Sequence, residues 1–216
     1  MTEDKTSLAF DPGKFKVGVL ALQGSFEEHL AVLGSLGVEA VEIRLPEQLA
    51  DLDGLIIPGG ESTTIGKLAV DFGLLEPLRS FGLEKAIWGT CAGAILLSRD
   101  ARRSQPLLEL MDITVARNAY GRQIASFEME LDIPVLKTVS NNLEPFNGVF
   151  IRAPLISSVG EEAKTLAALP DGSVVAAQQD HLLATASHPE LTDDDRIHRY
   201  FLHLIQQKTR RLWREN

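Results

Sequence analysis

Apolar and polar positions follow two patterns that alternate along the first hundred residues. The run KVGVLAL at 16–22 is almost wholly apolar and contains β-branched side chains, which is typical of a strand covered on both faces. Residues 25–37 space their large apolar side chains along one face of a helix, with Ser25 as N-cap and Gly37 as the stop. Further strands are predicted at 39–43, 52–58 and 85–88, and helical pieces at 64–72 and 74–81. Such alternation favours a mostly parallel sheet with helices on both faces.

The second half of the chain changes to shorter strands. The sequence PDGS at 170–173 is a strong hairpin turn. A long amphipathic helix is predicted from Asp193, and it ends in a basic stretch that complements the helix dipole. We therefore predict one three-layer α/β domain at 15–216, with a central, mostly parallel sheet, additional short antiparallel strands and a loosely ordered tail at 1–14. The short strands are expected at 125–133, 147–154, 165–179 and 181–188.

The composition excludes several classes of function. The chain has 216 residues and a formal net charge of −9, and an acidic surface repels phosphate backbones, so we expect no nucleic acid partner. Its apolar runs are shorter than the roughly 18 residues of a membrane span, so we expect no membrane partner. The start lacks the apolar core of a secretory signal. A single cysteine forms no disulfide within the chain, which suits a cytoplasmic protein.

That one cysteine, Cys91, lies in the frame Gly89-Thr90-Cys91-Ala92-Gly93 between a predicted strand and a predicted helix. The comparable serine-centred frame makes a sharp elbow that holds a nucleophile in a strained backbone conformation, and its small neighbours avoid clashes. A helix N-terminus favours the thiolate, and the next backbone N–H can donate to an oxyanion. The alternative is a small buried cysteine at a glycine-rich strand end.

A nucleophilic cysteine needs a base and a group that orients the base. His188 and Glu190, in the sequence SHPEL, are the best candidates, because the carboxylate lies two residues past the histidine. A loop histidine beside an unrelated glutamate remains the alternative. The zinc deaminase signature also contains H-x-E, but it requires two further cysteines, so no metal is predicted.

Two other regions carry candidate binding residues. Gly59 and Gly60 follow a strand and precede a helix, a turn whose N–H groups could face an anion; an ordinary strand–turn–helix junction is the alternative. Arg117 and Arg152 lie beside turn-forming residues and could pair with a substrate carboxylate, although surface arginines are commoner. The remaining histidines have weaker claims, and we expect helical surface or partly packed positions for His29, His198 and His203 and a loop position for His181.

In this order, the motifs GVLALQG, PGGEST, GTCAG, RNAYGRQ, SFE, FIRAP and HPELT closely resemble the glutaminase subunits of pyridoxal 5′-phosphate synthases. These subunits belong to the class I, triad-type glutamine amidotransferases, and the resemblance covers roughly residues 16 to 205. GTCAG and HPE are shared widely in that class, whereas LALQG, PGGEST and RNAYGRQ…SFE point to the vitamin B6 branch. The resemblance implies a flavodoxin-like, class I amidotransferase-like fold.

The same resemblance implies hydrolysis of L-glutamine to L-glutamate and ammonia without a cofactor. Cys91 would form a γ-glutamyl thioester, His188 would carry the proton, Glu190 would orient His188, and Gly60 and Ala92 would supply the oxyanion hole. Ammonia would pass to a separate synthase (lyase) subunit in a large hetero-oligomer. The implied glutamine-binding positions are Gly59, Gly60, Glu61, Arg117, Ile151 and Arg152, with Gln23 near the site and the partner interface.

One position departs from the family pattern. Ser187 precedes His188 where the family more often has an aromatic residue, which leaves the triad intact but could loosen its packing. Two alternatives remain open. One is a glutaminase of another amidotransferase pathway or another cysteine hydrolase of similar fold, and the other is a non-catalytic regulatory subunit that docks on a synthase.

Overall fold

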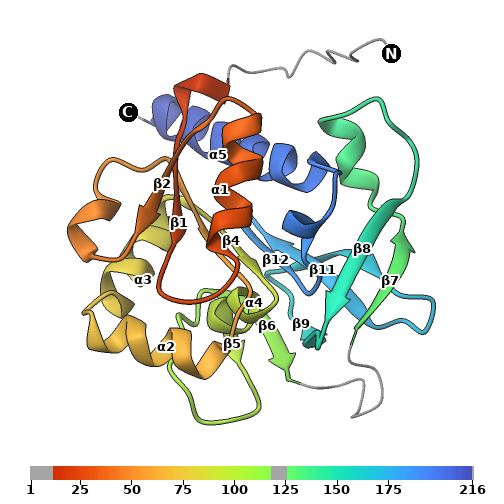
Figure 1. The fold of residues 1–216 in the computed structure, drawn as a ribbon, viewed down its shortest axis with the longest axis horizontal. Coiled ribbons are helices and arrows are strands. Elements are labelled where there is room, and N and C mark those ends of the chain that lie inside the picture. Colours follow the sequence, from red (N-terminus) through yellow and green to blue (C-terminus); the bar gives the residue numbers. More distant parts are fainter. Residues whose placement is uncertain (1–11, 118–125, 216) are drawn as a thin grey trace.

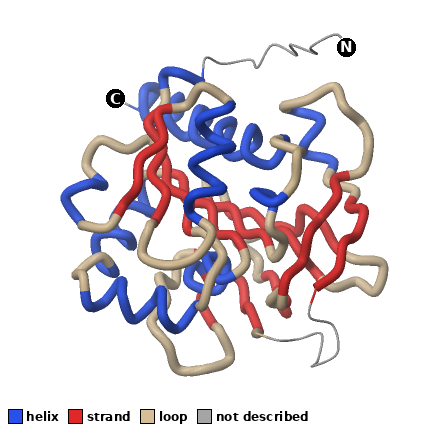
Figure 2. Tube along the Cα trace, viewed as in Figure 1, coloured by secondary structure: helices blue, strands red, loops and turns tan. Residues whose placement is uncertain are grey.

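The computed structural model describes residues 12–117 and 126–215, with side chains as far as Arg211. A ten-stranded sheet runs through its centre (Figures 1 and 2). Nine strands follow one another across it, and β10 (Lys164–Ala168) pairs with β11 off this row. In spatial order the nine are β2 (Glu39–Ile43), β1 (Lys16–Leu20), β3 (Gly54–Ile57), β4 (Ala86–Thr90), β12 (Leu182–Thr185), β11 (Val174–Gln179), β9 (Leu155–Val159), β6 (Met111–Ala116) and β5 (Ser98–Asp100).

The first five strands of this row are parallel, and their order β2-β1-β3-β4-β12 is that of flavodoxin-like sheets. From β12 onward the pairs β11–β12, β9–β11 and β6–β9 are antiparallel, and only the short edge pair β5–β6 is again parallel. The predicted turn at 170–173 connects β10 to β11 as an antiparallel hairpin. A parallel sheet with added antiparallel strands in the second half is therefore confirmed.

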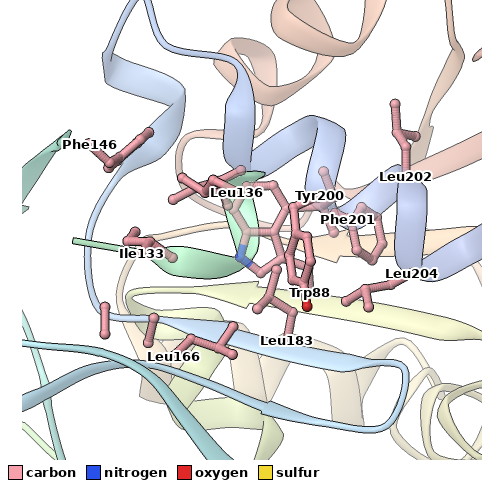
Figure 3. Close-up of a cluster of buried hydrophobic side chains, with 14 of the residues drawn as sticks. Trp88, Ile133, Leu136, Phe146, Leu166, Leu183, Tyr200, Phe201, Leu202 and Leu204 are labelled. Atoms are coloured by element: carbon pink, nitrogen blue, oxygen red, sulfur yellow. The ribbon is translucent and has the colours of Figure 1, made fainter. Parts of the chain in front are cut away.

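Helices cover both faces of the sheet, which gives the three predicted layers (Figure 1). α1 (Phe26–Ser35) and α5 (Arg196–Glu215) pack on one face, where Trp88 of β4 lies among Phe201, Leu204 and Leu183 (Figure 3). α2 (Ser62–Asp71), α3 (Leu75–Glu84) and the short α4 (Ala92–Leu97) contribute to a second apolar cluster on the opposite face. None of the described helices is both long and apolar enough to cross a membrane.

A separate two-stranded antiparallel sheet lies beside the main one. It consists of β7 (Ser126–Leu131) and β8 (Phe146–Ile151), joined through a 3₁₀ turn at Pro134–Thr138. Phe127 and Phe150 stack with ring centroids 4.6 Å apart, and the buried Phe150 belongs to the same cluster as α1 and α5. This small sheet brings the end of β8 next to the carboxyl ends of the central strands.

Several predicted boundaries need correction. The first strand ends at Leu20, the third spans only Gly54–Ile57, and the last helix begins at Arg196 rather than Asp193. Strands β5, β6 and β9 were not expected. Pro12–Lys14 form a 3₁₀ turn, whereas the rest of the tail, and all of RNAYGRQ except Arg117, lie outside the described residues.

Candidate active site

The carboxyl ends of β1, β3, β4 and β12 lie at one edge of the sheet, because these strands are parallel. A pocket of about 400 Å³ opens there. It is lined by every sequence-predicted site residue except Glu190, which lies behind His188. The predicted residues that line it are Gln23, Gly59, Gly60, Glu61, Cys91, Ala92, Arg117, Ile151, Arg152 and His188. A larger hollow of about 690 Å³ is lined by none of them.

Cys91 occupies the predicted elbow between β4 and α4. Its φ is 48° and its ψ is −103°, a conformation that residues with a side chain rarely adopt. Its N–H donates to the carbonyl oxygen of Thr185 over 2.8 Å, which ties the elbow to the neighbouring strand β12. Cys91 as a whole is only 7% exposed, yet it lines the pocket.

Only glycine fits at several positions around Cys91, because a Cβ there would clash with neighbouring atoms. A Cβ on Gly89 would lie 2.4 Å from the carbonyl of Gly93, and one on Gly93 would lie 2.0 Å from the carbonyl oxygen of Ile57. A Cβ on Gly59 would lie 2.4 Å from Cε1 of His188. Close approach of backbone to backbone and backbone to imidazole therefore explains why the motif needs glycine at these places.

His188 and Glu190 follow β12 on a turn stiffened by Pro189. The Nδ1 of His188 lies 2.7 Å from Oε1 of Glu190, so Nε2 is the nitrogen that remains for Cys91. The backbone N–H of His188 donates to the carbonyl oxygen of Val149 in β8 over 2.8 Å. Ser187 is buried, and the contact between His188 and Glu190 forms without the aromatic residue typical of the family.

Burial and hydrogen bonding set the charges of this pair. Burial by itself would lower the pKa of His188, but hydrogen bonds to Cys91 and Glu190 outweigh it and raise that pKa to about 10. Burial likewise opposes ionisation of Glu190, yet the hydrogen bond from His188, the charge of His188 and the hydrogen bond from Ser25 hold its pKa below the usual value. The imidazole is therefore a cation at neutral pH, hydrogen bonded to Cys91 and Glu190.

Glu61 organises the opposite wall of the pocket. As N-cap of α2 it accepts hydrogen bonds from the hydroxyl of Thr63 and from the backbone N–H and hydroxyl of Thr64. These bonds, together with Arg117 at 2.7 Å, lower the pKa of Glu61 to about 2, against a smaller opposing effect of burial. The backbone N–H of Glu61 donates to Oε1 of Gln23 over 2.7 Å. The wall thus presents an ionised carboxylate paired with a guanidinium.

Ile151 and Arg152 reach the pocket from the small sheet. Ile151 ends β8, and Arg152 follows it with a φ of 44°. An arginine held in this rarely populated conformation marks a turn that the surrounding structure imposes. The structure thus brings together residues that lie at or just beyond the carboxyl ends of β1, β3, β4, β6, β8 and β12, although they are scattered through the sequence.

One contact of the triad was missed in the sequence. Ser25, predicted only as the N-cap of α1, makes no capping hydrogen bond; its hydroxyl donates to Oε1 of Glu190 over 2.7 Å. Only its position directly after the LALQG motif could have suggested a role at the site.

The expectation for the histidines was partly wrong. His29 and His198 are fully buried, because their rings pack against Trp88 between the sheet and the two helices that cover it. His203 is partly packed, as predicted. His181 bonds the carbonyl oxygen of Gly82 and Asp180, and it does not line the pocket. Within the described ranges, no cluster of three or more His, Cys, Asp or Glu side chains could hold a metal ion.

Comparisons with known proteins identify the family of this chain. The model of the SNO glutamine amidotransferase family matches residues 19–207. The pyridoxal 5′-phosphate synthase subunit PdxT of Chloroflexus aggregans is 56% identical, over 87% of this chain and 99% of that protein. The PdxT subunit of Herpetosiphon aurantiacus is 58% identical, with coverage of 87% and 99%. A crystal structure of a glutamine amidotransferase superposes with a TM-score of 0.80 at 47% identity, over 88% of this chain and 98% of the other.

Proposed function

The chain belongs to the SNO glutamine amidotransferase family, and from this we propose that it hydrolyses L-glutamine to L-glutamate and ammonia for the synthesis of pyridoxal 5′-phosphate. The observation that carries the proposal is the strained Cys91 elbow, with a His188–Glu190 pair aligned behind its sulfur. The names of relatives above 50% identity supply the product, because each is a subunit of pyridoxal 5′-phosphate synthase.

In the first half of the reaction, the Cys91 thiolate attacks the carbonyl carbon of the glutamine side-chain amide. A C–S bond forms, and the amide oxygen becomes an oxyanion that accepts hydrogen bonds from the backbone N–H groups of Gly60 and Ala92. His188 then donates the proton on Nε2 to the amide nitrogen. The C–N bond breaks, ammonia leaves, and a γ-glutamyl thioester remains on Cys91.

In the second half, neutral His188 takes a proton from water, and the hydroxide attacks the thioester carbonyl. The C–S bond breaks, glutamate leaves, and the thiolate and imidazolium are restored. Glu190 keeps Nδ1 of His188 protonated throughout, because its Oε1 lies 2.7 Å away. No redox partner is needed, because glutamine plus water gives ammonia and the γ-carboxylic acid of glutamate, which then loses its proton to solvent.

The pocket wall fits the polar end of the substrate. Arg117 and Arg152 offer guanidinium groups for the α-carboxylate, and Glu61 offers a carboxylate for the α-ammonium. Gly59, Gly60 and Ile151 line the path between these charges and Cys91. Bound glutamine would replace part of the existing contact between Glu61 and Arg117.

The proposal includes a partner. Ammonia passes, away from water, to a separate synthase (lyase) subunit in a cytoplasmic hetero-oligomer, and Gln23, which lines the pocket, is the residue we propose near the partner interface. Residues 15–216 act as the glutaminase domain. The support is the name of the relatives, which describes a subunit rather than a complete synthase.

The first test measures glutamate release from L-glutamine by the parent protein, with and without the matching synthase subunit. We expect release that rises when the synthase is added. Cys91→Ser should lower this release by about 10³-fold or more, because oxygen replaces the thiolate at a site built for sulfur. Cys91→Ala should abolish release while still binding the synthase, as measured by analytical ultracentrifugation.

Different failures have different meanings. Parental ammonia release from Cys91→Ala would overturn the mechanism. Strong activity that is indifferent to the synthase would keep the triad but contradict the vitamin B6 assignment. A parent that binds the synthase without hydrolysing glutamine would support a regulatory subunit instead.

A further inference from the structure

Two histidines lie in the interior directly behind the triad and take no part in the mechanism above. His29 of α1 and His198 of α5 are both fully buried, and Nδ1 of His29 lies 3.0 Å from Nε2 of His198. The other nitrogen of His29, Nε2, lies 3.3 Å from Oγ1 of Thr90 and 3.4 Å from Oε2 of Glu190. Trp88, labelled in Figure 3, packs edge-on against both rings.

The second oxygen of the Glu190 carboxylate, Oε2, needs a donor. The Glu190 side chain is fully buried, and Oε1 already accepts hydrogen bonds from His188 and Ser25. Oε2 accepts no hydrogen bond of good geometry from any described residue, and His29 Nε2 faces it. A buried carboxylate oxygen without a donor is costly, so a proton on Nε2 of His29 would relieve that cost.

The histidine pair has only two arrangements when both rings are neutral, because one nitrogen must donate to the other. In the first, His29 donates from Nδ1, so the lone pair of its Nε2 faces the Glu190 carboxylate and the proton of His198 lies on Nδ1. That Nδ1 is buried without a partner among the described residues, so this arrangement leaves a buried N–H unsatisfied and sets a lone pair against an anion.

In the second arrangement, His198 donates from Nε2 to Nδ1 of His29, and His29 donates from Nε2 toward Thr90 and Glu190. Only the lone pair of His198 Nδ1 then lacks a partner. A buried acceptor without a partner costs less than a buried N–H without one. The second arrangement is therefore favoured. It links α5 to the nucleophile through His198, His29, Glu190, His188 and Cys91.

We propose that His29 is a positioning residue for glutamine hydrolysis, which holds the Glu190 carboxylate in place through its Nε2–H while His198 fixes its tautomer. This inference rests on the proposed function. His29 touches neither substrate nor the reacting atoms and acts only through Glu190.

The charges around His29 agree with a neutral ring. Burial lowers the pKa of His29 to about 4, even though Glu190 and Glu28 raise it, and His188 lowers it further. Burial also holds the pKa of His198 well below its usual value. The groups that β4 presents to the ring, Trp88 and Thr90, are uncharged. Both histidines are therefore neutral around pH 7.

The first experiment reads the tautomers directly. Long-range ¹H–¹⁵N correlation spectra of the full-length protein with labelled histidine distinguish Nδ1–H from Nε2–H rings, with His29→Gln and His198→Gln used to assign the signals. We expect neutral Nε2–H rings for both His29 and His198. An Nδ1–H ring at His29 would overturn the proposal. This measurement needs no turnover, so it stands even if the parent releases no glutamate, a result that would defeat only the proposed function.

The second experiment compares His29→Leu, which has no donor, with His29→Gln, whose amide N–H can replace Nε2–H. With the synthase present, we expect His29→Leu to lower kcat by about 10- to 100-fold with little change in KM, because the misplaced carboxylate no longer holds His188. The range of pH over which kcat/KM is high should narrow from both sides, since Glu190 ionises less readily and His188 loses its proton more readily. His29→Gln should recover part of both effects.

Tyr200→Phe is the matched control. It removes another buried hydrogen bond of α5, from the Tyr200 hydroxyl to Oε1 of Gln178 at 2.6 Å, outside the histidine network. We expect a less stable protein with the parental pH profile. A His29→Leu protein that folds and keeps the parental pH profile would contradict the proposal. So would a His29→Gln protein with no recovery in which circular dichroism shows the native fold.

Discussion

Single residues at the site are constrained by contact distances as much as by chemistry. Cys91 combines a positive φ with a hydrogen bond to β12, and this geometry is possible only because Gly89 and Gly93 leave no side chains in the way. Gly59 likewise leaves room for the imidazole of His188, which a side chain at that position would meet. The chemistry of the nucleophile therefore depends on residues that have no functional group.

Gly59→Ala tests this dependence. The new Cβ would meet Cε1 of His188 at 2.4 Å, so the imidazole must move, and we expect glutamate release to fall by about 100-fold because small displacements of catalytic groups are costly. The measurement is kcat/KM with the synthase present, together with a urea unfolding curve. Gly34→Ala in α1 is the matched control: its Cβ meets nothing within 4 Å, so we expect parental activity and a gain of about 0.5–1 kcal/mol. Parental activity in Gly59→Ala would contradict the argument.

Much of the pocket lining could be predicted from the sequence at this scale, but the contacts between individual buried side chains could not. The motifs around Gly59, Cys91 and His188 are local, and the pocket brings them together as expected. The bond from Ser25 to Glu190 joins residues 165 positions apart, and the contact of His29 with His198 joins residues 169 apart. Helical spacing says which face a residue occupies, but it does not say what lies opposite that face.

At the scale of elements, the long helix α5 is held at its first residue. Arg196 is 5% exposed, and its guanidinium bonds Asp194 and the carbonyl oxygens of Asn142, Glu144 and Pro145 over the ring of Phe146. The helix thereby docks onto the loop that leads into β8. Farther along α5, Arg211 pairs with Asp180 on the exposed surface.

Arg196→Met should therefore destabilise the fold more than Arg211→Met. The first change removes the hydrogen bonds of a buried guanidinium to Asp194 and to three backbone carbonyl oxygens, and we expect a loss of about 1.5–3 kcal/mol in the free energy of unfolding. The second removes an exposed ion pair, worth about 0–1 kcal/mol. Urea unfolding of both variants at the same pH provides the measurement, and equal losses would show that Arg196 does not anchor the helix.

The elements themselves differed in how far the sequence predicted them. Amphipathic helices and fully buried strands were found within a few residues, since their periodicity is strong. Strand β6, Met111–Ala116, was missed although its buried and partly exposed positions alternate strictly, a signal that a period-two count would have found. Strand β5 has only three residues, too few for any period, and β9 has just one fully buried position.

At the scale of the whole molecule, the buried polar groups connect the catalytic edge of the sheet to one of its faces. Glu190, His29 and His198 run from the pocket into the layer formed by α1 and α5, between Trp88 and the helices. The core of this protein is therefore not uniformly apolar, and its stability must depend on pH. Composition alone predicts no such dependence, because it counts five histidines without locating them.

The pH dependence has a definite sign. The pKa of His29 is about 4 in the folded protein and about 6.5 when the chain is unfolded, so between these values the unfolded state binds more protons and stability falls as pH falls. From pH 7 to pH 5 this residue should cost about 2 kcal/mol of unfolding free energy. His188 acts in the opposite direction, since its folded pKa is raised to about 10, but it is present in both proteins compared below.

Urea unfolding of the parent and of His29→Gln at pH 7 and pH 5 isolates the effect. The glutamine side chain does not titrate, so we expect the parent to lose about 2 kcal/mol more than the variant over this interval. His203→Gln is the matched control, because His203 is only partly buried on the outer side of α5 and hydrogen bonded to Gln207. Burial and Arg210 lower the pKa of His203. The His203→Gln variant should therefore also have a weaker pH dependence of unfolding free energy than the parent, but the change should be smaller than in His29→Gln. An equal pH dependence in the parent and in His29→Gln would mean that His29 takes up its proton in the folded protein, and the neutral network behind the triad would then be wrong.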